Sequence, residues 1–147
     1  MDKFSFHLVQ LRRESGLSQG KVAAMLGIRE ASYQKYEYGS AKPRVVILTK
    51  LGELFQVSLD YLCGITQEKV SVSRSFPADI PLSLSKNIRA DREKLDLTQQ
   101  DIAASVGVSA SAYQQYELHL KMPSYHTLIK LAEILHLALD EALGRWD

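Results

Sequence analysis

The sequence repeats itself once, at a constant offset of 80 residues and without a gap. Solenoid proteins repeat at periods of roughly 20 to 50 residues and need three or more copies, so this pattern is typical of two whole domains. We expect copy one at residues 1–66, a linker at residues 67–81 and copy two at residues 82–147. The repeated pairs include Leu17 and Leu97, Gln19 and Gln99, Ala23 and Ala103, Gly27 and Gly107, Tyr33 and Tyr113, Tyr36 and Tyr116, Glu37 and Glu117, and Leu51 and Leu131.

Length and composition favour a small, self-sufficient fold in each copy. The chain has 147 residues, of which 46% are hydrophobic and 24% charged. Each copy has about the minimum length at which a helical core folds without a disulfide or a metal. The single cysteine, Cys63, has no partner within the chain, and we expect it to be buried. Because no apolar stretch approaches the roughly 20 residues of a membrane span, the sequence indicates a cytoplasmic protein that does not bind membranes.

The spacing of apolar residues is helical throughout, and it predicts an all-α fold with about five short helices per copy. In copy one, Ser18 is expected to cap a second helix that Gly27 ends. A third helix is expected from about Glu30 to Tyr38. Copy two repeats this scheme, with Thr98 and Ser109 as caps.

The central segment of each copy fits a helix-turn-helix. Two helices that meet at a steep angle need a small residue where they cross, a turn residue that tolerates positive φ, and large apolar anchors. Ala23, Gly27 and Tyr33 supply these features in copy one, and the equivalent residues supply them again in copy two.

On these residues the chain resembles the lambda-repressor-like, or XRE, family of helix-turn-helix DNA-binding domains. The resemblance implies two tandem five-helix domains, each with a third helix that enters the major groove of DNA. The residues that carry it are Leu17, Ser18, Gln19, Ala23, Leu26, Gly27, Ile28, Tyr33, Tyr36, Glu37, Gly39, Pro43, Leu48, Leu51, Val57, Ser58, Leu59 and Asp60, together with their counterparts in copy two.

The resemblance also implies roles for individual residues. Residues early in the recognition helices are candidates for reading bases: a lysine can donate to guanine, a glutamate can accept from cytosine, and a glutamine can pair with adenine, each worth about 1–3 kcal/mol of discrimination. These candidates are Glu30, Ala31, Ser32, Lys35, Ala110, Ser111 and Gln115. Residues that would position the domain on phosphates are Gln19, Lys42, Arg44, Gln99 and Lys121.

Some of the repeated residues have a structural alternative. The family pairs the glutamate matching Glu37 and Glu117 with an arginine of the first helix, here Arg12 and Arg92, and we favour this ion pair over a DNA contact. The repeated tyrosines could stack on bases, but we favour core packing. Glu30 could read a base or favour the positive end of its helix. Gln34 and Gln114 make either a shared contact or a structural one.

Copy two departs from the pattern in ways that weaken its expected contact with DNA. Residues 1–67 carry nine Lys or Arg against six Asp or Glu, whereas residues 82–147 carry seven against nine, giving net charges of +3 and −2. Asp91 replaces Leu11, and His119 replaces Gly39. Phosphate neutralisation supplies most non-specific affinity, so copy two either binds DNA more weakly or serves as a dimerisation or docking module.

We find no sequence pattern for a cofactor, a metal or a catalytic site. The histidines of copy two lack metal-ligand spacing, and neither a nucleophile motif nor a phosphate loop is present. The linker contains Val70 and Val72 in a short alternating pattern, which could pair with a copy of itself or form an extended tether.

The expected function is a sequence-specific DNA-binding transcriptional regulator, with promoter occlusion as the simplest mechanism of repression. Its partner would be double-stranded DNA. Two domains in one chain could span successive major grooves about 34 Å apart, or a homodimer could present its two first domains to a palindrome. The alternative is a protein-interaction module, an antitoxin or inhibitor, with a protein partner bound through copy two.

Overall fold

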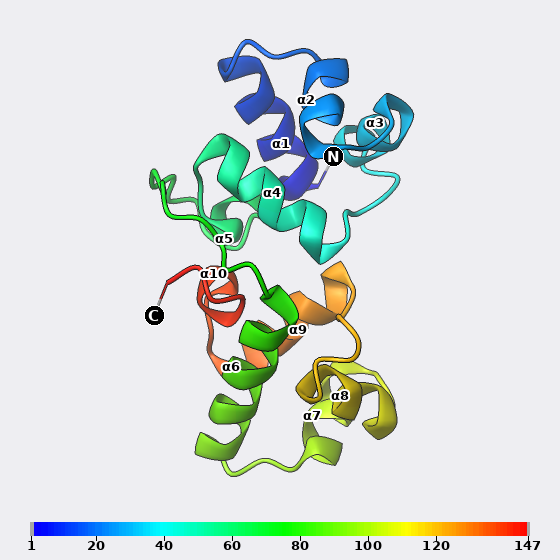
Figure 1. Cartoon of the computed structure of the whole chain (residues 1–147), viewed down its shortest axis with the longest axis vertical. Coiled ribbons are helices and arrows are strands. Elements are labelled where there is room, and N and C mark those ends of the chain that lie inside the picture. Colours follow the sequence, from blue (N-terminus) through cyan, green and yellow to red (C-terminus); the bar gives the residue numbers. More distant parts are fainter. Residues whose placement is uncertain (1, 147) are drawn as a thin grey trace. The chain divides into compact units, whose positions relative to one another are not determined.

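The computed structural model describes residues 2–146, which fold into two compact units that divide between Ser73 and Arg74 (Figure 1). We call them unit 1 and unit 2. Unit 1 consists of α1 (Lys3–Glu14), α2 (Gln19–Leu26), α3 (Glu30–Tyr38), α4 (Val45–Phe55) and α5 (Leu59–Leu62). Unit 2 consists of α6 (Ile80–Lys94), α7 (Gln99–Val106), α8 (Ala110–Glu117), α9 (Tyr125–Leu135) and α10 (Leu139–Ala142).

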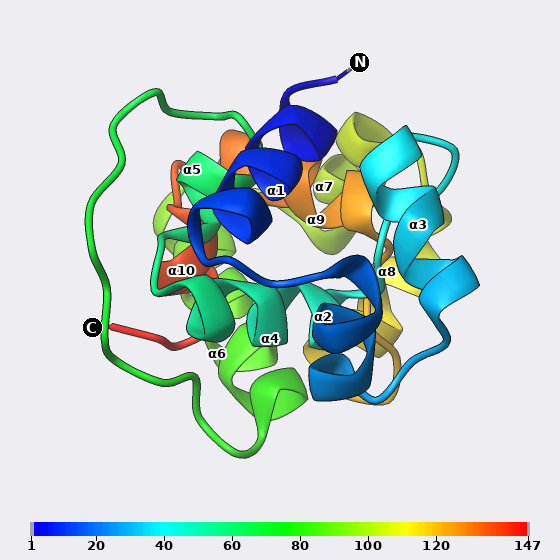
Figure 2. The same cartoon turned by 90° about the horizontal axis from the view of Figure 1, so that it is seen from above.

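Over the described residues, helices are the only extended regular elements of both units, which confirms the prediction of two tandem five-helix domains. In unit 1, α2 and α3 lie side by side and are joined by a tight turn, as Figures 1 and 2 show. The same two-helix arrangement recurs as α7 and α8 in unit 2. Within the described part of the chain, no helix is both long enough and apolar enough to cross a membrane.

The helix ends follow the expected cap residues. The Ser18 side chain accepts a hydrogen bond from the Lys21 amide at the start of α2. Thr98 and Asp101 form a reciprocal capping box at the start of α7. After α8, His119 adopts φ 48° where unit 1 has Gly39, so the loop keeps its left-handed turn with a residue that tolerates it less well.

The repeated apolar residues form the two cores. Tyr33 and Tyr113 are fully buried, and Tyr116 is buried as well, which confirms core packing for these tyrosines. Tyr36 differs, because its side chain is only half-buried beside the Tyr33 ring. The expectation that Cys63 is buried is also wrong, since this residue is partly exposed after the short helix α5.

The segment between α5 and α6 packs along its two neighbouring units. On the unit 1 side, Ser71 forms an isolated antiparallel bridge with Val57, and the Val72 amide donates to the Gln56 carbonyl at 2.8 Å. On the unit 2 side, Phe76 is buried, and Asp79 caps α6.

Candidate nucleic-acid interface

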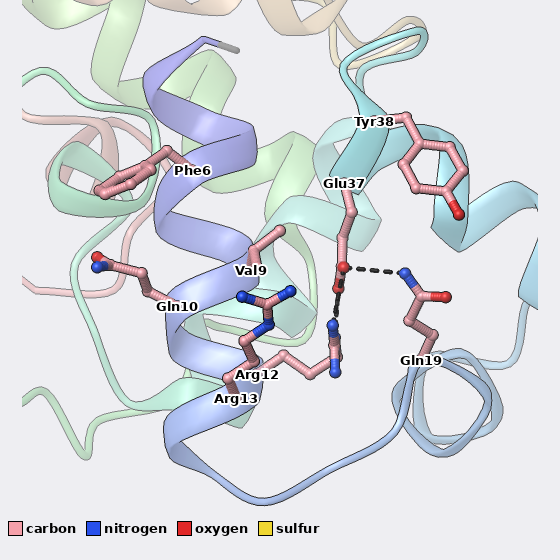
Figure 3. A pocket seen from close by; sticks show the side chains of 8 residues that line it. All are labelled: Phe6, Val9, Gln10, Arg12, Arg13, Gln19, Glu37 and Tyr38. Carbon is pink, nitrogen blue, oxygen red and sulfur yellow. Dashed lines mark hydrogen bonds and ion pairs between the residues drawn. The ribbon is translucent and has the colours of Figure 1, made fainter.

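A buried carboxylate lies at the centre of the helix-turn-helix of unit 1 (Figure 3). Glu37, at the end of α3, is 3% exposed. Arg12 of α1 binds it through two hydrogen bonds, from Nε to Oε2 at 2.5 Å and from Nη2 to Oε1 at 3.0 Å. The Gln19 amide Nε2, at the start of α2, donates to Oε1 at 3.0 Å. One carboxylate therefore ties together three helices.

Two further hydrogen bonds extend this network. Arg12 Nη1 donates to the carbonyl oxygen of Leu17 at 3.0 Å, which fixes the loop between α1 and α2. Gln34 Nε2 donates to Gln19 Oε1 at 3.1 Å, so Gln34 has a structural contact in unit 1. Planar, charge-assisted hydrogen bonds restrict geometry strongly. This network therefore fixes the orientation of α3 relative to α1 and to the start of α2.

Unit 2 repeats the network. Arg92 Nε donates to Glu117 Oε2 at 2.6 Å, and Arg92 Nη1 donates to the Leu97 carbonyl at 2.9 Å. Gln99 Nε2 donates to Glu117 Oε1 at 3.0 Å. The arginine–glutamate–glutamine contacts that position the recognition helix are thus the same in both units. The outer glutamine differs, because Gln114, the counterpart of Gln34, is exposed.

The network also sets the ionisation of its carboxylates. Burial by itself raises the pKa of Glu37, but the hydrogen bonds from Arg12 and Gln19 oppose this effect, and the pKa lies below its usual value. Glu117 has a lowered pKa for the same reasons. Both carboxylates are therefore charged at neutral pH and keep their arginine partners.

The recognition helix of unit 1 presents its predicted base-reading residues to solvent. Ala31 and Lys35 are exposed, and Ser32 is partly exposed. Glu30 is also exposed, but its carboxylate lies over the first turn of α2: a Cβ built on Gly20 would stand 2.7 Å from Glu30 Oε1. Helix N-termini favour negative charge, so this position suits a carboxylate that supports the start of a helix.

In unit 2, Ala110, Ser111 and Gln115 are exposed on α8. The counterpart of Glu30 is Ala110, and the counterpart of Gly20 is Gln100. In unit 1 the long side chain of this pair is on the recognition helix, whereas in unit 2 it is on α7. The start of α8 therefore carries small residues, which allow close approach to a DNA groove.

The predicted phosphate-binding residues are not equivalent in the structure. Arg44 and Lys121 are exposed. Lys42 forms an ion pair with Asp2 and is mostly covered. The side-chain amides of Gln19 and Gln99 already donate to the buried glutamates, so their contribution to a phosphate site includes fixing the first turn of α2 and α7.

Two cations of unit 1 were not among the predicted site residues. Lys21 and Arg29 are exposed at the starts of α2 and α3. Arg29 and Arg44 occupy N-cap positions without making a side-chain cap, at helix ends that disfavour positive charge. The 80-residue repeat could have indicated these cations. Lys21, Arg29 and Arg44 correspond in copy two to Asp101, Ser109 and Ser124, and each of these three residues stabilises the start of a helix.

A pocket lies beside the network, mostly along α1 (Figure 3). It has a volume of about 560 Å³, and its rim includes the exposed rings of Phe6 and Tyr38. Arg13 adds a cation that is itself exposed. The residues that line it are Phe6, Val9, Gln10, Arg12, Arg13, Gln19, Glu37 and Tyr38.

The chain is similar to several transcriptional regulators. It is 29% identical over 65 residues to the cryptic phage CTXphi transcriptional repressor RstR of Vibrio cholerae, a match that covers 44% of this chain and 58% of RstR. It is 41% identical over 59 residues to the uncharacterized HTH-type transcriptional regulator YqaE of Bacillus subtilis, covering 40% of this chain and 51% of YqaE. The chain thus spans little more than half the length of these relatives.

A longer match extends beyond one domain. The HTH-type transcriptional regulator AnsR of Bacillus subtilis is 30% identical over 88 residues, which cover 60% of this chain and 76% of AnsR. The helix-turn-helix family model HTH_3 matches twice, at residues 8–62 and 88–141. Because these two matches span most of the chain and coincide with the two folded units, the chain belongs to the helix-turn-helix family HTH_3 and carries its domain in two tandem copies.

Proposed function

We propose that this chain is a sequence-specific DNA-binding transcriptional regulator that represses by occluding a promoter. The observation that carries the proposal is the combination of a buried Arg–Glu–Gln network with exposed residues early in α3 and exposed cations on α3 and at the starts of α2, α3 and α4. The names of the relatives support it, since RstR is called a transcriptional repressor and AnsR a transcriptional regulator.

Unit 1 is the principal DNA-binding domain in this proposal. Four exposed cations lie on α3 or at the starts of α2, α3 and α4: Lys35, Lys21, Arg29 and Arg44. Their counterparts in unit 2 are Asp101, Ser109, Gln115 and Ser124, which together carry one negative charge. Since cations that neutralise phosphates supply non-specific affinity, unit 2 contributes less affinity and reads bases chiefly through Gln115.

The proposal is tested by measuring binding to random duplex DNA over a series of salt concentrations. We expect affinity to fall steeply between 50 and 200 mM salt, with a log–log slope of about −0.9 for each phosphate contacted. A flat response, or no binding at 50 mM salt, would contradict DNA binding. Selection of sites from a random pool then separates the architectures: a palindrome indicates a homodimer using unit 1 twice, and two unlike half-sites indicate both units of one chain.

The division of roles between Lys35 and Gln19 gives a second prediction. Lys35→Ala should relax the preference at one base pair by about tenfold, because a direct base contact is worth about 1–3 kcal/mol. Gln19→Ala should weaken binding to all sequences by a similar factor, since it loosens the start of α2. Gln99→Ala, which removes the equivalent amide from unit 2, is the matched control. The hypothesis fails if Lys35→Ala and Gln19→Ala each change affinity equally for every sequence.

One observation favours a second function for unit 2. Leu118 and Leu120, which follow α8, are 50% and 74% exposed, and Leu120 replaces a serine of copy one. Exposed large apolar residues beside a recognition helix favour contact with a protein. If unit 2 is a protein-interaction module through which two chains associate, Leu118→Ser combined with Leu120→Ser should abolish self-association of the chain, measured by sedimentation. The affinity of unit 1 for DNA should stay unchanged.

A further inference from the structure

The sequence between α5 and α6 was expected to form a linker over residues 67–81, but most of this segment has contacts on one unit or the other. On unit 1, the Ile65 amide donates to the Asp60 carbonyl at 2.8 Å, and the Lys69 ammonium lies 2.6 Å from the Glu14 carboxylate. Val72 is the last residue with such a contact, through its hydrogen bond to Gln56. The chain thus remains attached to unit 1 up to this point.

On unit 2, a buried arginine holds the other half of the segment. Arg145 Nε donates to the carbonyl oxygen of Arg74 at 2.7 Å, and the Arg145 guanidinium lies 4.8 Å from the centre of the Phe76 ring. Arg145 is 1% exposed, and its Nη1 donates to Asp140 Oδ1 at 2.9 Å, a pair in which both side chains are fully buried. We call this arrangement the Arg145 clasp.

Gly144, next to Arg145, packs closely against α6 and against Pro77. Gly144 has φ 86°, and a Cβ built on it would stand 3.2 Å from Pro77 Cγ and 2.8 Å from Ser83 Cβ. Any side chain at this position would press on Ser83 of α6 and on Pro77. The turn that carries Arg145 therefore lies directly against the first turn of α6 and against Pro77.

Within the described residues of unit 1, Arg145 has no equivalent, because its counterpart is Ile65, which is 52% exposed. The close approach at Gly144 does recur there: a Cβ built on Gly64 would clash with the Cβ of Lys3, the counterpart of Ser83. The arginine contacts are therefore what distinguish the clasp of unit 2. Only Ser73, which is exposed, separates Val72 from Arg74, so the two attachment points are at most about 7 Å apart along the chain. If residues 74–78 came free, the reach from Val72 to Asp79 would grow to about 25 Å.

We propose that Arg145 determines the spacing of DNA half-sites that one chain can occupy, because it holds residues 74–76 on unit 2 and reduces the linker to a hinge at Ser73. The inference rests on the proposed function of DNA binding by both units. A short hinge restricts simultaneous binding to the few spacings that it can span, whereas a longer tether tolerates many.

Two variants test the proposal on the full chain. Arg145→Ile with Asp140→Asn removes the clasp, installs the arginine's copy-one counterpart and avoids an unpaired buried carboxylate. Insertion of Gly-Ser-Gly-Ser after Ser73 lengthens the hinge and leaves the clasp intact. If the first variant misfolds, this insertion still shows whether hinge length limits the spacing of half-sites. Asp140→Asn alone is the control for the loss of charge.

Two readouts separate the clasp from its role on DNA. Backbone ¹⁵N relaxation should show residues 74–76 as rigid as α6 in the wild type and in the insertion variant, but mobile in the double variant. On duplexes that carry the two selected half-sites at graded spacings, wild-type affinity should fall about tenfold or more away from one spacing, and both variants should flatten this profile.

Each outcome decides one part. Equal mobility of residues 74–76 in the wild type and the double variant would overturn the clasp. A spacing profile of the double variant identical to that of the wild type, or a single selected half-site, would overturn the role of Arg145 in spacing; an unchanged profile of the insertion variant would show that hinge length does not limit spacing. No DNA binding by the wild type would overturn the proposed function and the spacing role together, while the relaxation data would still decide whether the clasp exists.

Discussion

Replacing Glu37 with alanine should lower the free energy of unfolding of unit 1 by about 3–5 kcal/mol, because it leaves the Arg12 guanidinium buried without its counterion. Arg12 is 12% exposed and Glu37 is 3% exposed, so water cannot replace the lost hydrogen bonds fully. The Gln19 amide loses its acceptor as well. Denaturation followed by NMR signals assigned to each unit measures the loss, which should be confined to unit 1.

The second copy supplies the matched control. Glu117→Ala should destabilise unit 2 by a similar amount, because the Arg92 pair has nearly the same exposure and geometry. Arg12→Met with Glu37→Leu should restore most of the stability, since an apolar pair leaves no buried charge. A loss below about 1 kcal/mol for either alanine variant would show that solvent compensates for the network.

The same network predicts a pH dependence. The folded-state pKa of Glu37 and that of Glu117 lie below the usual value of 4.5, so both carboxylates bind protons more weakly in the folded protein than in the unfolded chain. Their contribution is present above about pH 4.5 and is lost as pH falls through the lowered pKa values. Thermal unfolding should therefore show a steeper loss of stability below pH 4.5 in the wild type than in Glu37→Ala combined with Glu117→Ala.

The repeated part of the chain could be predicted well because its determinants are local. Cap residues such as Ser18 and the helical spacing of apolar residues fix helices from neighbours in the sequence. The pairing of Arg12 with Glu37 followed from the family resemblance, and the structure places these two side chains together. What repeats in this chain is the scaffold, and the scaffold is what the sequence predicted.

The missed features depend on contacts between distant residues. Arg145 binds the carbonyl of Arg74, which is 71 positions away, and no periodicity indicates such a contact. Its copy-one counterpart is an isoleucine, so the repeat offered no template. The approach of Glu30 to Gly20 likewise depends on the crossing of two helices. The positions at which the two copies differ are those where tertiary contacts, and not local sequence, determine the structure.

Those differences also predict that unit 1 can lose DNA affinity while gaining stability. Lys21→Asp, Arg29→Ser, Lys35→Gln and Arg44→Ser together install the residues of copy two. In unit 2, Asp101 completes a capping box, and Ser109 and Ser124 accept hydrogen bonds from the first turns of α8 and α9. An N-cap is worth about 0.5–2 kcal/mol, so the variant should unfold at a higher temperature than the wild type.

The affinity for random duplex DNA should change in the opposite direction. Removing the three phosphate-neutralising cations Lys21, Arg29 and Arg44 should make the salt slope less negative by about 2.7, which corresponds to a difference of about 40-fold between 50 and 200 mM salt. The reciprocal control is unit 2 with Asp101→Lys, Ser109→Arg, Gln115→Lys and Ser124→Arg, which should gain affinity and lose stability. An unchanged salt slope in the unit 1 variant would place the DNA-binding face elsewhere. A loss of affinity in a more stable domain would show that these cations are kept for binding, at positions where the fold itself favours caps.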